Sequence, residues 1–133
     1  MHYKVQGDAK YMKHKYLCEL FPDGKLPFPY GEEDYPDFDE RDTFSMDHTL
    51  IAWLYERLRY FQDEASDVIN FEFHKFEIDN EELTQRQCID RMVEDCAVIL
   101  KSDIWSNEDY DKINAAKDDL FKVLSKIYWF MWW

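Results

Sequence analysis

Apolar residues recur every three or four positions over the last two-thirds of the chain, a period that predicts amphipathic α-helices. The first predicted helix covers residues 46–65, with the apolar stripe Leu50, Leu54, Leu58, Phe61 and Ala65. A second begins at Asn80 or Thr84, with the stripe Ile89, Met92, Val93, Cys96, Ala97, Leu100 and Ile104. A third begins at Ser106 or Asn107, with the stripe Ile113, Ala116, Leu120, Val123, Leu124 and Ile127. Three stripes of similar length predict a mainly α protein built as a three-helix bundle.

Glycine and proline, the residues that interrupt helices, lie only near the start of the chain. All three glycines and all four prolines occur at or before Pro36. Residues 1–44 are therefore predicted to be an irregular, loop-rich segment, and residues 45–133 to be the helical bundle of the same single domain, 1–133. Within the irregular segment, Pro22-Asp23-Gly24-Lys25 predicts a turn that could close a short β-hairpin. Residues 68–78 alternate between apolar and polar side chains, which favours a short strand or an extended bridge.

Composition narrows the class of protein. The chain has 133 residues, 46% of them hydrophobic and 18% aromatic, enough for one domain with its own core. Its net charge of −13 disfavours direct binding to nucleic acid or to an anionic membrane. Three cysteines in no disulfide pattern fit a reducing cytoplasm. No apolar run is long enough to span a bilayer.

The most polarised part of the sequence is residues 32–42, EEDYPDFDERD, with seven carboxylates and one arginine. One interpretation is a negative strip with interleaved rings that occupies a basic groove on a partner protein. The candidate partner-binding residues are Glu33, Asp34, Tyr35, Asp37, Phe38 and Asp39. The alternative is a solvated loop whose two rings pack into the bundle. A calcium loop is disfavoured because the central glycine and the twelfth-position glutamate of an EF-hand are missing.

Two further groups of residues are candidates for binding. Four arginines could hold the phosphates of a small anionic nucleotide while aromatic rings stack on its base, or could simply pair with carboxylates: Arg57, Arg59, Arg86 and Arg91. The last six residues are apolar on every side of a helix. This end either packs on the N-terminal segment or contacts a partner or a second copy through Trp129, Trp132 and Trp133.

Known catalytic and metal-binding signatures are missing from the sequence. It holds no G-x-S-x-G, no phosphate-binding glycine loop, no H-E-x-x-H and no C-x-x-C. The four histidines are scattered and define no pair of base and nucleophile. We therefore predict no catalytic residues, no metal and no cofactor, and a protein that is not an enzyme.

Residues 43–61 resemble a pattern found in small uncharacterised proteins of tailed bacteriophages. That pattern has a hydrophobe-x-Leu-Asp start, an apolar helix and a Pro-Arg-Leu-Lys-x-Phe end. Here Met46-Asp47 matches the start and Arg57-Leu58-x-x-Phe61 the end, with Glu56 where proline is common. Ile89-Asp90-Arg91-Met92 is similar to the core of the second helix in those proteins, and residues 122–133 to their aromatic last helix. The resemblance covers residues 43–133 and carries no established activity.

The resemblance implies a setting, the cytoplasm of an infected bacterium. There the leading hypothesis is a phage accessory protein that inhibits by binding, with a host defence or nucleic-acid-handling protein of basic surface as its target. A second hypothesis is a sponge that sequesters an anionic cyclic nucleotide used as an immune signal. A third is an oligomeric structural or assembly component.

Overall fold

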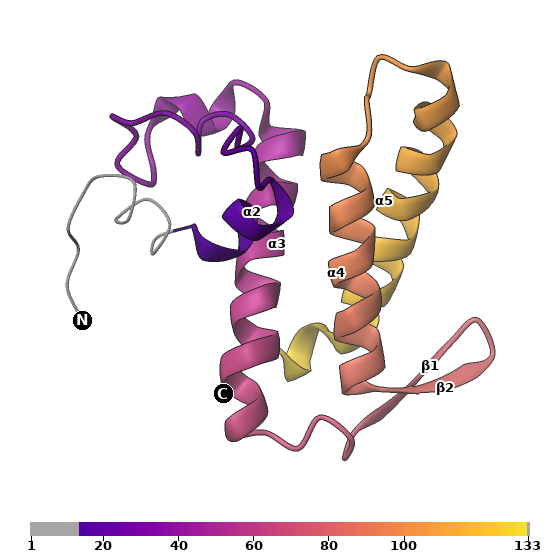
Figure 1. Cartoon of the computed structure of the whole chain (residues 1–133). Coiled ribbons are helices and arrows are strands. Elements are labelled where there is room, and N and C mark those ends of the chain that lie inside the picture. Colours follow the sequence, from indigo (N-terminus) through magenta and orange to yellow (C-terminus); the bar gives the residue numbers. More distant parts are fainter. Residues whose placement is uncertain (1–13, 133) are drawn as a thin grey trace. The chain divides into compact units, whose positions relative to one another are not determined.

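The computed structural model describes residues 14–132 and confirms a mainly helical protein (Figure 1). In chain order the elements are α2 (Lys15–Leu20), the 3-10 turn η1 (Glu40–Thr43), α3 (Met46–Glu64), η2 (Ala65–Asp67), β1 (Lys75–Ile78), β2 (Glu81–Thr84), α4 (Gln85–Lys101), α5 (Asn107–Ile127) and η3 (Tyr128–Phe130). Within residues 14–132, no helix combines the length and the apolarity needed to cross a membrane. The chain divides into two compact units, one ending at Glu56 and the other starting at Arg57.

The helix boundaries follow the capping signals in the sequence. Thr84 caps α4 through a reciprocal pair of bonds: its hydroxyl accepts from the Gln87 amide (3.1 Å), and the Gln87 side chain accepts from the Thr84 amide (2.9 Å). α5 starts beside Ser106, as predicted, with Glu108 and Asp109 in its first turn. The negative charges of these two carboxylates stabilise the helix, because they lie near the positive end of its dipole.

The first unit contains a helix that the sequence did not predict. α2 occupies the stretch before Pro22, and a turn rather than a hairpin follows it, with Gly24 at a φ of 81°. The β-hairpin that this turn could have closed is therefore not formed, because the residues before the turn are helical. α2 depends on a distant residue: the buried Glu56 side chain accepts a hydrogen bond from the Leu17 amide at 2.8 Å. A carboxylate at a helix N-terminus accepts a hydrogen bond from an otherwise unpaired amide and interacts favourably with the positive end of the helix dipole.

The buried face of α3 is rotated from the predicted stripe. Leu58, Phe61 and Ala65 are buried as expected, but Leu50 is exposed. Ile51 and Tyr55 are buried in its place. Because one residue step turns a helix by about 100°, a stripe that starts one residue later faces a different direction. Tyrosine is amphipathic and is easily counted as polar. The buried face that includes Tyr55 is therefore hard to recognise from the sequence.

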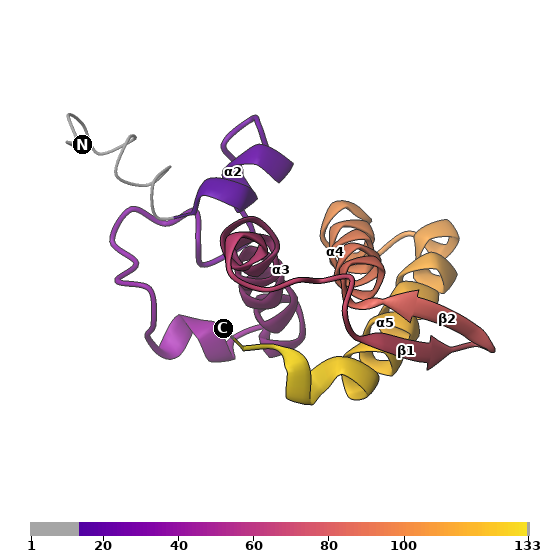
Figure 2. The ribbon, with the colours of Figure 1, turned by 90° about the horizontal axis from the view of Figure 1, so that it is seen from below.

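In the second unit, α4 and α5 run antiparallel and β1 and β2 form a hairpin packed against them (Figure 2). The core between the helices comes from the predicted stripes, including Ile89, Met92 and Leu120. The hairpin turns at Asp79 and Asn80, both with positive φ (54° and 64°). A turn of this kind usually contains glycine. Because glycine is missing here, the hairpin could not be predicted from the sequence, and only a strand within residues 68–78 was predicted.

Charged side chains tie α4, α5 and the hairpin turn together. Arg91 on α4 makes a two-pronged contact with Asp119 on α5 and also bonds Asp79 in the turn at 2.9 Å. Lys122 on α5 reaches Asp79 at 2.8 Å. These bonds hold the turn against the helix pair, although the cluster is partly solvent-exposed and each surface pair contributes little by itself.

A carboxyl pair lies beside this cluster. Asp95 on α4 lies beside Asp119 on α5, close enough for the two carboxyl groups to share a hydrogen bond when one of them is protonated. Burial, and then the hydrogen bond to Asp119, raise the pKa of Asp95 to about 8. Arg91 lowers the pKa of Asp119. At neutral pH Asp95 is therefore protonated, and its O–H group donates a hydrogen bond to the ionised Asp119.

We expect Asp95→Asn to remove a pH-dependent loss of stability. The pKa of Asp95 is higher in the folded state than in the unfolded chain. The stability that protonated Asp95 contributes to the folded state is therefore fully present below about pH 4 and is lost as the pH rises toward 8. Asparagine donates to Asp119 without titrating. At pH 8.5 the variant should exceed the wild type in free energy of unfolding by about 1–2 kcal/mol.

Urea denaturation at pH 5 and pH 8.5 measures this difference. Asp118→Asn is the matched control, because Asp118 is the exposed neighbour of Asp119 and pairs only with Lys117 among the described contacts. An Asp95→Asn protein that loses as much stability between the two pH values as the wild type contradicts the assignment.

Candidate protein-binding surface

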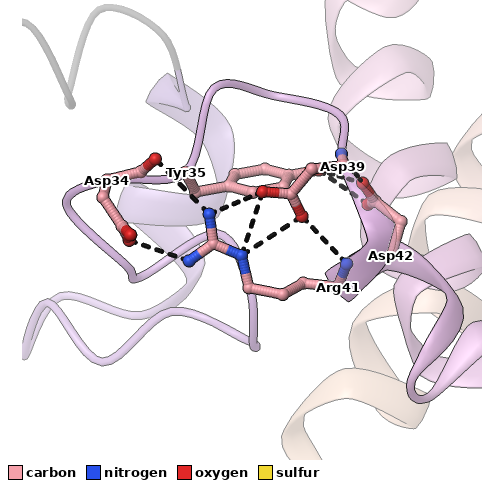
Figure 3. A network of polar contacts seen from close by, with 5 residues as sticks. All are labelled: Asp34, Tyr35, Asp39, Arg41 and Asp42. Carbon is pink, nitrogen blue, oxygen red and sulfur yellow. Dashed lines mark hydrogen bonds and ion pairs between the residues drawn. The ribbon is translucent and has the colours of Figure 1, made fainter.

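The acidic segment, residues 32–42, folds around its one arginine (Figure 3). The Arg41 guanidinium bonds the Asp39 carboxylate through two nitrogens, with Nε donating to Oδ1 at 3.1 Å and Nη2 donating to Oδ2 at 2.6 Å. Its Nη1 donates to Oδ1 of Asp34 at 2.8 Å. One cation thus bridges two carboxylates from opposite ends of the segment, in the bidentate geometry that guanidinium favours.

Short-range hydrogen bonds complete this network. Asp39 caps η1 by accepting from the Arg41 amide at 2.9 Å, and its own amide donates to Asp42 at 2.9 Å. The Tyr35 hydroxyl donates to the two carboxylate oxygens of Asp42 at 2.6 and 2.7 Å. The Arg41 guanidinium lies 5.5 Å from the centre of the Tyr35 ring. The segment is therefore cross-linked by its own side chains.

The electrostatics keep Asp34, Asp39 and Arg41 ionised and Tyr35 neutral. Hydrogen bonding to Arg41 lowers the pKa of Asp34 and of Asp39, and the same bonds raise the pKa of Arg41. Burial, and then the bond to Asp42, raise the pKa of Tyr35, so its hydroxyl stays a donor. The network is consequently at full strength at neutral pH.

The six candidate residues of this segment have different roles. Tyr35 is only 6% exposed, so its assignment as a contact residue is corrected: its ring packs edge-on against Tyr30 and supports the segment from within. Phe38 is 81% exposed and remains a contact candidate. Both alternatives therefore occur in this segment: the Tyr35 ring packs inward and the Phe38 ring faces solvent.

The carboxylates also divide into two groups. Asp34 and Asp39 are engaged with Arg41, and Asp37 lies 3.3 Å from the His14 imidazole. The side chains of Glu32, Glu33 and Glu40 are exposed and take part in no hydrogen bond or ion pair among residues 14–132, although the Glu40 backbone carbonyl accepts from the Thr43 hydroxyl at 2.7 Å. We call these three glutamates together with Phe38 the acidic surface.

A pair of rings that sequence analysis did not single out continues from η1. Phe44 directly follows this turn, is exposed, and stacks parallel to Phe28 with ring centres 6.2 Å apart. Only the fold brings these residues together, since they lie far apart in an irregular part of the sequence. The stack adds apolar contact area next to the carboxylates.

The four arginines are engaged in contacts within the protein. Arg91 bonds Asp119 and Asp79, and Arg86 bonds Glu72 and lies 5.3 Å from the Phe71 ring centre. Arg59 donates to Gln62 at 3.1 Å. Arg57 is exposed in the second half of α3, about two turns before its end, and also has a contact within the protein. Pairing with protein groups, the alternative to anion binding, thus accounts for Arg86 and Arg91.

The C-terminal rings are at the surface. Trp129 and Trp132 are 80% and 74% exposed, and the Trp132 indole donates to the Trp129 carbonyl at 3.1 Å. Trp133, the third predicted contact residue, lies outside the described residues. In the described chain, no group of three or more histidine, cysteine, aspartate or glutamate side chains has the arrangement of a metal site.

Comparisons with family models, with curated proteins and with solved structures find no match to this chain.

We expect Arg41→Gln to loosen the acidic segment without unfolding the protein. Asp34 and Asp39 then lose the cation that joins them, and their mutual repulsion opens η1. The amides of Asp39, Arg41 and Asp42 should exchange with solvent about fivefold faster, the range expected for local opening after loss of an exposed ionic network.

Hydrogen exchange followed by NMR measures these amides one by one. Lys25→Gln is the matched control, because it removes the same charge from an exposed residue whose only described bond involves its backbone amide. Unchanged exchange in Arg41→Gln, or equal acceleration in both variants, contradicts the role given to Arg41.

Proposed function

We propose that this chain is a non-enzymatic binding protein that occupies a basic surface on a partner protein through its acidic surface. The observation that carries the proposal is the Arg41 network, which holds an anionic segment in one conformation while Glu33, Glu40 and Phe38 face solvent. A segment with this composition would otherwise be held apart by charge repulsion.

Preorganisation is what makes the segment suited to recognition. Its order is already established by internal bonds, so a partner does not have to supply the free energy of ordering it. The exposed glutamates provide long-range attraction to a basic surface, which raises the association rate. Phe38 and the Phe28–Phe44 stack of the same unit provide exposed rings that can be desolvated in an interface.

The proposed setting is the cytoplasm of a phage-infected bacterium, on the basis of the resemblance of residues 43–133 to small phage proteins. Host proteins that handle nucleic acid carry basic surfaces shaped to receive phosphates. An anionic protein that occupies such a surface blocks it. We therefore propose that the chain is a phage accessory protein that inhibits a host defence or nucleic-acid-handling protein. The pairing of Arg86 and Arg91 with carboxylates gives no specific support to a nucleotide sponge.

We expect the double charge reversal Glu33→Lys/Glu40→Lys to abolish binding while the fold is retained. Full-length protein immobilised on beads is incubated with bacterial lysate at rising salt, and retained proteins are identified by mass spectrometry. A genuine target is retained by the wild type, is released as salt rises, and binds the double variant at least about tenfold more weakly.

Glu77→Lys/Glu81→Lys is the matched control, since it makes the same change of charge at exposed positions of the hairpin. Binding that survives the first double variant, or is lost equally with the control, contradicts the acidic surface as the binding site. Reversal of Asp37 or Asp39 is avoided because both side chains are engaged within the protein, Asp37 with His14 and Asp39 with Arg41.

A further inference from the structure

The second unit carries an aromatic surface of its own, which we call the ring surface: Phe73, His74, Tyr128, Trp129, Phe130 and Trp132. Ring contacts join its two parts, because Phe130 of η3 lies 4.6 Å from His74 and 5.1 Å from Phe76 of β1. Gln85, almost fully buried, donates from Nε2 to the Phe130 carbonyl at 2.7 Å. The C-terminal rings are thus held against the hairpin.

Most of this aromatic area faces water. Phe73 and Trp129 are at least three-quarters exposed, and Tyr128 is more than half exposed. If a ring side chain presents about 200 Å² when free, the rings together expose on the order of 600 Å². This equals the largest apolar patches found on ordinary monomers, and approaches the ~800 Å² that each partner contributes to a standard interface.

The charges around the ring surface indicate what can cover it. Glu72 and Lys75 flank Phe73 and His74 in the chain, and both are neutralised by neighbours: Arg86 pairs with Glu72 at 2.5 Å, and Lys75 with Glu82 at 3.8 Å. In a chain with net charge −13, this margin is locally balanced. A strongly charged partner finds no complementary field here, and a second copy of the chain meets little repulsion.

We propose that the ring surface is a homodimer interface, in which two copies of this chain meet ring against ring about a twofold axis. A twofold arrangement places the same rings on both sides, so one surface supplies its own complement. The interface is separate from the acidic surface, which lies in the first unit and whose like charges repel a second copy. A dimer carries two acidic surfaces. Its apparent affinity for a target with two or more binding sites therefore exceeds that of a monomer.

Sedimentation velocity of the full-length protein over a wide concentration range tests the proposal. We expect reversible dimers with a dissociation constant between about 1 μM and 1 mM, as suits an aromatic interface of modest area. Phe73→Ser/Trp129→Ser should be monomeric over the same range. High salt should leave wild-type dimers intact, since the contact is apolar and its margin neutral.

Trp105→Ser is the matched control, because Trp105 is 90% exposed but lies in the connection between α4 and α5. It should dimerise like the wild type. Circular dichroism checks that each variant is folded, and Trp132→Ser is the substitute if the double variant is not. A wild type that is monomeric throughout, dimers that persist in the folded ring variants, or dimers lost equally with Trp105→Ser would overturn the proposal.

Because Glu33→Lys/Glu40→Lys leaves the ring surface intact, its dimerisation is expected to be unchanged, which separates this test from that of partner binding.

Discussion

Charge neutralisation by Arg41 is the constraint on which the acidic segment depends. Carboxylates dominate residues 32–42, and a chain with this composition ordinarily stays extended and solvated. One guanidinium alters that outcome because its planar fork reaches Asp34 and Asp39 together. The capping box of η1 and the Tyr35–Asp42 bonds fix the turn that follows Asp39. A lysine at this position could offer the charge but not the two-pronged geometry.

The network also separates the tasks of chemically identical side chains. Carboxylates that bond to Arg41 or cap the turn hold the backbone in place, and those on Glu33 and Glu40 remain available for contact with a partner. The two rings divide in the same way, with Tyr35 inside and Phe38 outside. Charge content alone therefore does not separate the carboxylates that hold the segment from those that are left exposed. The distribution of internal bonds does.

Features set by local physics were predictable from the sequence, and features set by distant contacts were not. The Thr84–Gln87 capping box and the apolar period fix α4 within a few residues, so its position could be predicted. α2 could not, because a six-residue helix is marginal alone and depends on Glu56, far along the chain. The hairpin was hidden because Asp79 and Asn80 adopt positive φ without glycine, in a turn that Arg91 and Lys122 hold from other elements. The candidate binding segment was predicted as a region, but the division of its residues needed the fold.

The Leu17–Glu56 hydrogen bond has a consequence for how this protein can be dissected. Composition places a natural cut between residues 44 and 45, where the irregular sequence gives way to helix. A fragment ending there would carry the acidic segment but not the carboxylate that caps α2, nor the α3 residues Ile51, Ala52 and Tyr55 that belong to the core of the first unit. The smallest graft that transfers this surface to another scaffold must therefore extend through the first three turns of α3. The fold of the unit that carries the acidic segment thus depends on part of α3 as well as on the residues before it.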